Sequence, residues 1–151
     1  MKIERFEDLE IWQEARSLCK QVCKINRQNP FCNDYKLRDQ IRTSSGSVMD
    51  NIAEGFGRGG NKEFSMFLTV AIGSANETQS QLYRAWDQDY ISQQEFDELY
   101  RKAEEIMRKT GKLIQYLKSS EYKGIKYNEQ RTTNYKPINN GAWSNFSLHC
   151  F

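Results

Sequence analysis

The side chains in this 151-residue chain that could perform chemistry are few, and their spacing does not suit catalysis. The one histidine, His149, stands near the C-terminal end, whereas a general base must be held rigidly beside the proton that it removes. Cys19 and Cys23 stand four residues apart, so a helix places them on one face. Two thiolates are only half of a tetrahedral zinc site, and no second pair follows. We therefore expect no catalytic residue, no metal site and no cofactor, and we interpret the thiols as reduced and partly buried.

Basic residues offer a second kind of chemistry, which is contact with phosphates. Four of them form one stripe on the first predicted helix, at spacings of four, four and three: Arg16, Lys20, Lys24 and Arg27. At about 100° per residue this stripe lies opposite the apolar stripe of the same helix. A ring of identical subunits would multiply its field. Weaker candidates for nucleic-acid binding are Arg38, Arg42, Arg58 and Lys62. The alternative interpretation is an ordinary solvated face.

A polar cluster follows on the second predicted helix. Asn51, Glu54 and Arg58 recur at spacings of three and four, which places them on one helical face if the helix lasts to Arg58. The cluster could face a ligand or a nucleic acid. We favour a structural network that fixes the loop or a subunit contact, because a helix that ends in glycines needs local hydrogen bonds.

Composition limits the class of protein. The mean hydropathy is −0.84, hydrophobic residues make up 38%, and the formal net charge is +2. No apolar segment approaches the roughly 20 residues that cross a membrane, and the N-terminus has no apolar signal-peptide region. We expect a cytoplasmic helical protein that does not enter a membrane. Its net charge alone is too small to identify a nucleic-acid binder.

Four amphipathic helices can position these residues. Helical apolar spacing predicts them at about 9–27, 34–55, 61–86 and 93–118. Asp8 and Asn61 are the predicted N-caps of the first and third helices, and Ser92 with Glu95 forms a capping box for the fourth. Mid-helix small residues, including Gly46 and Gly73, predict close helix–helix approaches. Short connections favour an all-α, up-down-up-down antiparallel four-helix bundle. Charges on the fourth helix alternate in sign, which predicts solvated salt bridges among Arg101, Lys102, Arg108, Lys109 and Lys112 and their acidic neighbours.

Residues 1–118 therefore form the expected bundle domain, and residues 119–151 form a C-terminal tail. The tail is polar and contains aromatic residues, and four bases in it stand against two acids. We expect it to be irregular or disordered in the free monomer, and either to pack on the bundle or a neighbouring subunit or to fold on a partner.

Three strings resemble a known family: FEDLEIWQEARSL (6–18), DQIRTSSGSVMDNIAEGFGRGGNKEFSMFL (39–68) and SQLYRAWDQDYIS (80–92). They are similar to the four-helix-bundle proteins known as 23S rRNA intervening-sequence proteins, over roughly residues 2–118. The resemblance implies a four-helix bundle that assembles as a homo-oligomer, commonly a pentamer, with no enzymatic activity. Some bacterial members are encoded within 23S ribosomal RNA genes. A relative is the basic accessory protein of diversity-generating retroelements, which works with a reverse transcriptase. Met49 stands where many members have proline.

Two functions from different classes follow. The first is an oligomeric accessory protein that binds nucleic acid, either structured RNA, which is the expected target, or DNA. A reverse transcriptase is a further expected partner if the chain is a retroelement accessory. The second is a protein-interaction scaffold without nucleic-acid binding, which relies on the near-neutral bundle and the aromatic tail.

Overall fold

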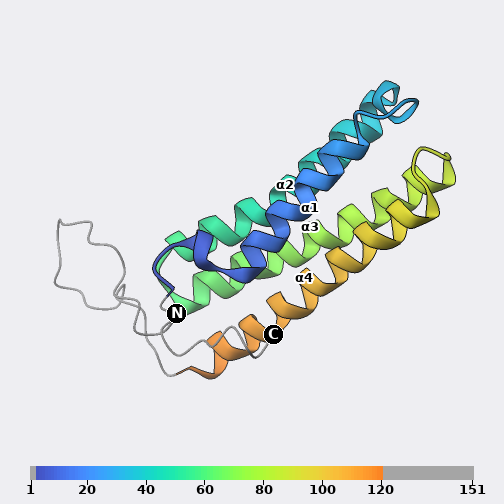
Figure 1. Cartoon of the computed structure of the whole chain (residues 1–151). Helices are drawn as coiled ribbons and strands as arrows, with labels where there is room; N and C mark the ends of the chain where they lie inside the picture. Colours follow the sequence, from blue (N-terminus) through green and yellow to red (C-terminus); the bar gives the residue numbers. More distant parts are fainter. Residues whose placement is uncertain (1–2, 121–151) are drawn as a thin grey trace.

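Four long helices account for most of the chain. The computed structural model describes residues 3–120, and its helices run along almost the whole length of the molecule (Figure 1). Two short 3-10 turns, η1 and η2, precede the first two long helices. The elements are η1 (Phe6–Asp8), α1 (Glu10–Ile25), η2 (Phe31–Asn33), α2 (Tyr35–Gly57), α3 (Asn61–Asp87) and α4 (Gln93–Ser119).

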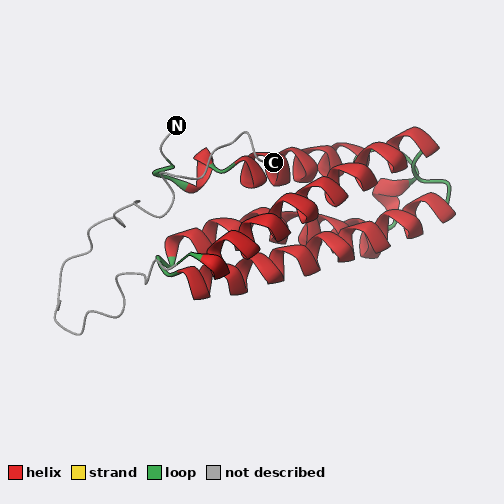
Figure 2. Cartoon of the chain, turned by 90° about the horizontal axis from the view of Figure 1, so that it is seen from below, coloured by secondary structure: helices red, strands yellow, loops and turns green. Residues whose placement is uncertain are grey.

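The helices pack antiparallel, each against its neighbours in the chain, and α1 closes the bundle against α4. The view in Figure 2 shows all four helices side by side, joined by short connections. The most extensive helix–helix contact lies between α2 and α3. The predicted all-α antiparallel four-helix bundle is therefore confirmed.

The apolar stripes of the four helices together form the core. Each helix contributes buried side chains at helical spacing, such as Leu18, Ile52, Leu68 and Ile106, all no more than 1% exposed. Burying a side chain of this size contributes about 1.5–3 kcal/mol. Phe31 of η2 is also fully buried, so the connection between α1 and α2 is held by the core. Among residues 3–120, no helix is both long and apolar enough to cross a membrane.

The start of α1 differs from the prediction. Leu9 occupies the N-cap position, and Asp8 belongs to η1. The Asp8 carboxylate accepts the backbone N–H groups of Glu4 and Arg5, each at 3.1 Å. These hydrogen bonds lower the pKa of Asp8 from its ordinary value. Asp8 therefore stabilises the turn before the helix instead of capping α1.

The start of α3 also differs. Gly60 is its N-cap, and Asn61 is already its first helical residue. The Asn61 side-chain amide donates to the Ser120 hydroxyl at 2.6 Å and lies 3.4 Å from the Leu117 carbonyl oxygen. Asn61 thus ties the beginning of α3 to the end of α4.

The capping box at the start of α4 is confirmed. The Glu95 backbone N–H donates to the Ser92 hydroxyl oxygen at 3.1 Å, and the Ser92 backbone N–H donates to the Glu95 carboxylate at 2.8 Å. Ile91 and Phe96, which flank the box, are both buried. Two backbone donors at the helix start are thereby satisfied.

The close helix–helix approach occurs at a different glycine from those predicted. A Cβ atom on Gly55 would stand 2.6 Å from Phe67 Cβ of α3, whereas one on Gly46 or Gly73 would meet no atom within 4 Å. Within residues 3–120, no side chain or neighbouring helix approaches the Cβ positions of those two glycines. The serines beside them form hydrogen bonds between α2 and α3 instead, and the Ser74 hydroxyl lies 3.0 Å from that of Ser47.

Candidate nucleic-acid interface

The predicted basic stripe lies on the outer surface of α1. Because α1 buries one face against α2 and α4, residues on the opposite face remain in water. All four members of the stripe are exposed: Arg16, Lys20, Lys24 and Arg27. Arg16, Lys20 and Lys24 therefore present positive charge along about two turns of α1, and Arg27 adds to it from the turn that follows the helix.

Two bases of α2 lie beside this stripe. The Asn26 side-chain amide of α1 donates to the Arg38 carbonyl oxygen at 3.3 Å, which fixes the end of α1 against the start of α2. Further along, the Ser45 hydroxyl of α2 lies close enough to the Cys19 thiol to influence its pKa. Because the helices run antiparallel, Arg42, which is exposed, lies at the level of Cys23. The structure thus brings Arg38 and Arg42 next to the α1 stripe.

Not all of these charges are available to a ligand. The Arg38 guanidinium donates to the Asp39 carboxylate at 2.9 Å and to the Cys32 carbonyl oxygen at 3.2 Å. The Arg16 guanidinium lies 5.9 Å from the centre of the Trp12 ring. On the α1 stripe and beside it, four exposed bases form no ion pair, no side-chain hydrogen bond and no ring contact with residues 3–120: Lys20, Lys24, Arg27 and Arg42. Elsewhere in the described chain Lys36, Lys62, Arg101, Lys112 and Lys118 are also exposed without such a partner, so the four are set apart by their grouping. We call these four residues the α1–α2 basic surface.

The other two candidates lie elsewhere. Arg58 stands 20 residues after Arg38 on or just beyond α2, which corresponds to roughly 30 Å along the helix axis. Its guanidinium donates to Glu54 and lies 5.3 Å from the Phe67 ring centre. Lys62 is exposed at the start of α3. Arg58 and Lys62 therefore lie at the opposite end of the bundle from Arg38 and do not extend the basic surface.

The predicted polar cluster of α2 divides into two parts. Glu54 and Arg58 form an ion pair with both side chains about half exposed. The Asn51 amide instead donates back to Ser47, to the carbonyl oxygen at 2.8 Å and to the hydroxyl at 2.9 Å. Asn51 thus bonds toward the middle of α2, and Glu54 toward its C-terminal end.

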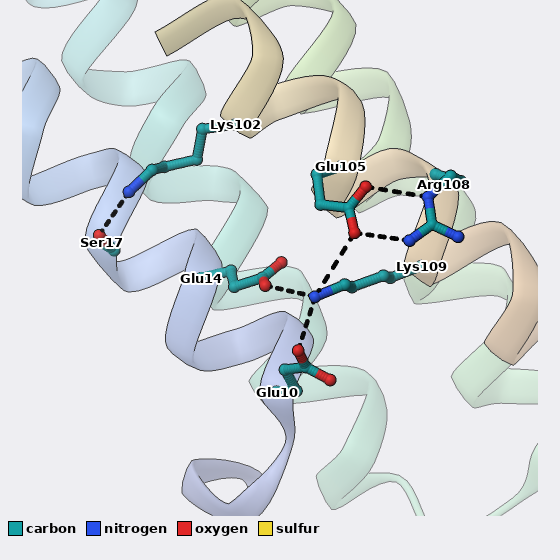
Figure 3. Close-up of polar contacts among 7 residues, drawn as sticks. All are labelled: Glu10, Glu14, Ser17, Lys102, Glu105, Arg108 and Lys109. Carbon is teal, nitrogen blue, oxygen red and sulfur yellow. Dashed lines mark hydrogen bonds and ion pairs between the residues drawn. The ribbon is translucent and has the colours of Figure 1, made fainter. Parts of the chain in front are cut away.

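One strong polar site was missed by the sequence analysis. Lys109 of α4 is only 5% exposed, so the prediction of a solvated salt bridge there is wrong. Its ammonium group points across to α1, where it donates to the carboxylates of Glu10 and Glu14 (Figure 3). About two turns earlier on α4, Lys102 donates to the Ser17 hydroxyl at 2.9 Å. The sequence contains only half of the signal: Glu10, Glu14 and Ser17 share the edge of the α1 apolar stripe, but nothing on α4 marks Lys109 as their partner.

The electrostatics of this cluster follow from its contacts. Burial alone would lower the pKa of Lys109, but its hydrogen bonds to Glu10 and Glu14 outweigh that effect and raise the pKa. The neighbouring Glu105 accepts hydrogen bonds from the Arg108 guanidinium, as Figure 3 shows, and its pKa falls to about 2. Each of the three carboxylates forms an ion pair with Lys109 or Arg108, so the cluster joins α1 to α4 and serves the packing of the helices.

Metal binding has no support in the part of the chain that the structure describes. No group of three or more histidine, cysteine, aspartate or glutamate side chains there could hold a metal ion. The three cysteines between residues 3 and 120 are free thiols. His149, Cys150 and the predicted tail lie outside the described residues, apart from Ser119 at the end of α4 and Ser120, its C-cap.

Comparison with known proteins agrees with the bundle. A family model described as "23S rRNA-intervening sequence protein" matches residues 7–112. A crystal structure of a protein of unknown function from the S23 ribosomal protein family of Bacteroides thetaiotaomicron superposes with a TM-score of 0.64. The match covers 70% of this chain and 98% of that chain at 19% sequence identity, so it shows the shared fold. No curated protein matches the chain.

Proposed function

The chain belongs to the 23S rRNA-intervening sequence protein family, and we propose that it is a non-enzymatic, oligomeric accessory protein that binds structured RNA. The observation that carries the proposal is the α1–α2 basic surface. Four exposed bases without an anionic partner among residues 3–120 lie together there, whereas Arg38, Arg58, Arg108 and Lys109 are paired internally and the other unpaired bases lie elsewhere on the bundle. The choice of RNA over DNA rests on the family's description.

A small net charge does not argue against this role. Attraction to phosphates depends on local potential, and the net charge of +2 is an average over the whole chain. Paired charges such as Lys109 with Glu10 cancel each other locally. The α1–α2 basic surface, which includes Lys20 and Lys24, keeps its positive potential because its charges are not paired. Each phosphate that it neutralises releases a counterion.

The proposal includes self-association. Met66 and Val70 of α3 are 57% and 48% exposed, and the space beside Gly73, the next residue along this outer face, is open. We propose that the outer face of α3 contacts another copy of the chain in a homo-oligomer, with a pentamer as the expected size. Because α1 and α3 stand diagonally in the bundle, association through α3 leaves the basic surface of every copy uncovered.

A binding titration tests the RNA proposal. Purified protein is titrated into labelled structured RNA and duplex DNA at low and near-physiological salt, with the mass measured by light scattering. The reversal Lys20→Glu/Lys24→Glu is expected to weaken RNA binding at least tenfold and to reduce the salt slope. Absence of RNA binding at low salt contradicts the proposal and favours a protein-interaction scaffold.

The matched control is Lys112→Glu/Lys118→Glu. Both lysines are exposed near the C-terminal end of α4, away from Lys24, and the change in net charge is the same. The control is expected to bind nearly as tightly as the unaltered chain. Equal weakening by the two double reversals assigns binding to overall charge and removes the α1–α2 basic surface from the proposal.

A substitution on α3 tests the oligomer. Val70→Glu is expected to reduce the molecular mass that light scattering measures, and an unchanged mass contradicts the α3 contact.

A further inference from the structure

Two thiols of α1 lie together at its contact with α2. The Cys23 thiol and the Ser45 hydroxyl of α2 both lie close enough to the Cys19 thiol to influence its pKa. Both thiols are free and half-buried. They stand one helical turn apart on the same flank of α1, between the core and the basic stripe. This pairing of two reduced sulfurs at a helix–helix contact has no role in the proposed RNA binding.

We propose that Cys19 and Cys23 form a two-thiol site that captures a soft, thiophilic centre of the trivalent arsenical class. The centre bridges the two sulfurs and closes one ring on the flank of α1. Among residues 3–120 no further cysteine, histidine or acidic ligand completes a three-ligand metal site there, so the site suits a centre that needs only two sulfurs.

The helix geometry favours a bridge over a disulfide. Residues four apart on a helix have Cβ atoms about 5–6 Å apart, whereas a disulfide needs about 3.5–4.5 Å. A bridging atom between the two sulfurs spans the larger distance without distorting α1. The pair therefore stays reduced within an intact helix and remains open to a bridging centre.

The chemistry balances without an oxidant. With an organoarsenic oxide, two S–H bonds and the arsenic–oxygen bond break and two arsenic–sulfur bonds form. The two protons leave with the oxygen as one water molecule, and arsenic stays trivalent. Burial, together with the nearby Cys23 sulfur, raises the pKa of Cys19. Cys19 is therefore mainly a thiol at neutral pH and a poor nucleophile toward alkylating reagents, whereas exchange with an arsenic oxide consumes its proton.

The second thiol raises the affinity of the site for the arsenical. Once one thiol has bound, the other reacts as an intramolecular partner at a high effective concentration, which raises the overall affinity by 10²-fold or more. A single cysteine such as Cys32, which is hydrogen-bonded to Asn29 instead of to another thiol, lacks this advantage.

The test uses phenylarsine oxide and the full-length variant Cys32→Ser/Cys150→Ser, which keeps only the pair. This protein is expected to retain one phenylarsenic group by intact mass in excess monothiol and to release it to 1,2-ethanedithiol. Adding Cys19→Ser or Cys23→Ser is expected to weaken retention about 10²-fold. Equal retention after either substitution, or no retention by the pair, overturns the proposal.

A second measurement separates capture by the folded protein from capture by an unfolded chain. A ligand that binds the folded state preferentially raises the Tm. Phenylarsine oxide is therefore expected to raise the Tm of Cys32→Ser/Cys150→Ser and to leave that of its Cys19→Ser derivative unchanged. A lower Tm on binding would show that the arsenical traps the unfolded chain, and it contradicts a site in the native helix.

Discussion

The ammonium group of Lys109 in α4 donates to the carboxylate of Glu10 in α1 at 2.6 Å. Glu14 takes a second hydrogen bond from the same ammonium group, and the Lys109 side chain is only 7% exposed. Each of these two carboxylates also keeps one buried oxygen atom without a hydrogen-bond partner. The cluster therefore fixes how α4 lies against α1, and it does so at a cost in desolvation.

Removing the Lys109 ammonium should destabilise the bundle strongly. In Lys109→Ala, two carboxylates face each other with no cation between them, so we expect the free energy of unfolding to fall by about 3–5 kcal/mol. Urea denaturation followed by circular dichroism measures it. Lys112→Ala, an exposed neighbour, should change it by less than about 0.5 kcal/mol; similar losses in the two variants contradict the buried pairing.

Replacing the whole cluster by neutral side chains should recover stability. In Glu10→Gln/Glu14→Gln/Lys109→Met no buried charge lacks a partner, and substitutions of this kind are often neutral or stabilising. We expect this triple variant to be more stable than Lys109→Ala in the same urea experiment. A triple variant as unstable as the single one would show that Lys109 acts through its packing and not its charge.

Acid should weaken the fold through Glu105. Its pKa is about 2 in the folded chain, mainly because Arg108 donates to it, compared with 4.5 as the ordinary value. A carboxyl group with a lowered pKa contributes stability above its ordinary value, and that stability disappears as the pH falls toward the folded-state pKa. We expect Glu105→Gln to flatten the pH dependence of stability between about pH 5 and pH 2. A denaturation series across this range checks it, and an unchanged slope contradicts the assignment.

Two glycine substitutions should change the free energy of unfolding in opposite directions. In Gly55→Ala the new Cβ would meet Phe67 Cβ at 2.6 Å and Phe64 Cδ2 at 2.8 Å, so overpacking should cost about 1–3 kcal/mol. In Gly111→Ala the new methyl meets nothing within 4 Å. The gain in helix propensity should then stabilise the chain by up to about 1 kcal/mol. Thermal unfolding compares them, and a stabilising Gly55→Ala would show that α2 and α3 lie further apart.

The buried serine between α2 and α3 should also be sensitive. The Ser44 hydroxyl donates to the Gln81 side-chain oxygen at 2.6 Å and lies 2.9 Å from the Thr78 hydroxyl. Ser44→Ala leaves a buried acceptor on Gln81 without this donor, which should cost about 1–3 kcal/mol. Thr43→Ala, one residue away and exposed, is the control and should cost less than about 0.5 kcal/mol in the same urea titration.

The sequence predicts the helices well because their apolar spacing and the Ser92–Glu95 box are local signals. Asp8 and Asn61 were misassigned because both residue types also bond to other backbone and side-chain groups, and only the fold reveals that Asn61 reaches Ser120. The exposure of Lys20 and Lys24 follows from their position opposite the apolar stripe. The pairing of Lys109 with Glu10 joins residues 99 positions apart, and no spacing rule on α4 contains that information.

The Asn61–Ser120 contact also fixes a useful reference point on the molecule. It holds Ser120 beside the turn between α2 and α3, whereas Gln28, just beyond α1, is hydrogen-bonded to Glu95 at the start of α4. The 25 residues between Glu95 and Ser120 span roughly 38 Å of helix at 1.5 Å per residue. Fluorescent dyes on residues 27 and 120 would therefore lie near the two ends of α4 and report the distance between them. Energy transfer between them would register fraying of α4 from its C-terminal end long before the bundle loses its overall helicity.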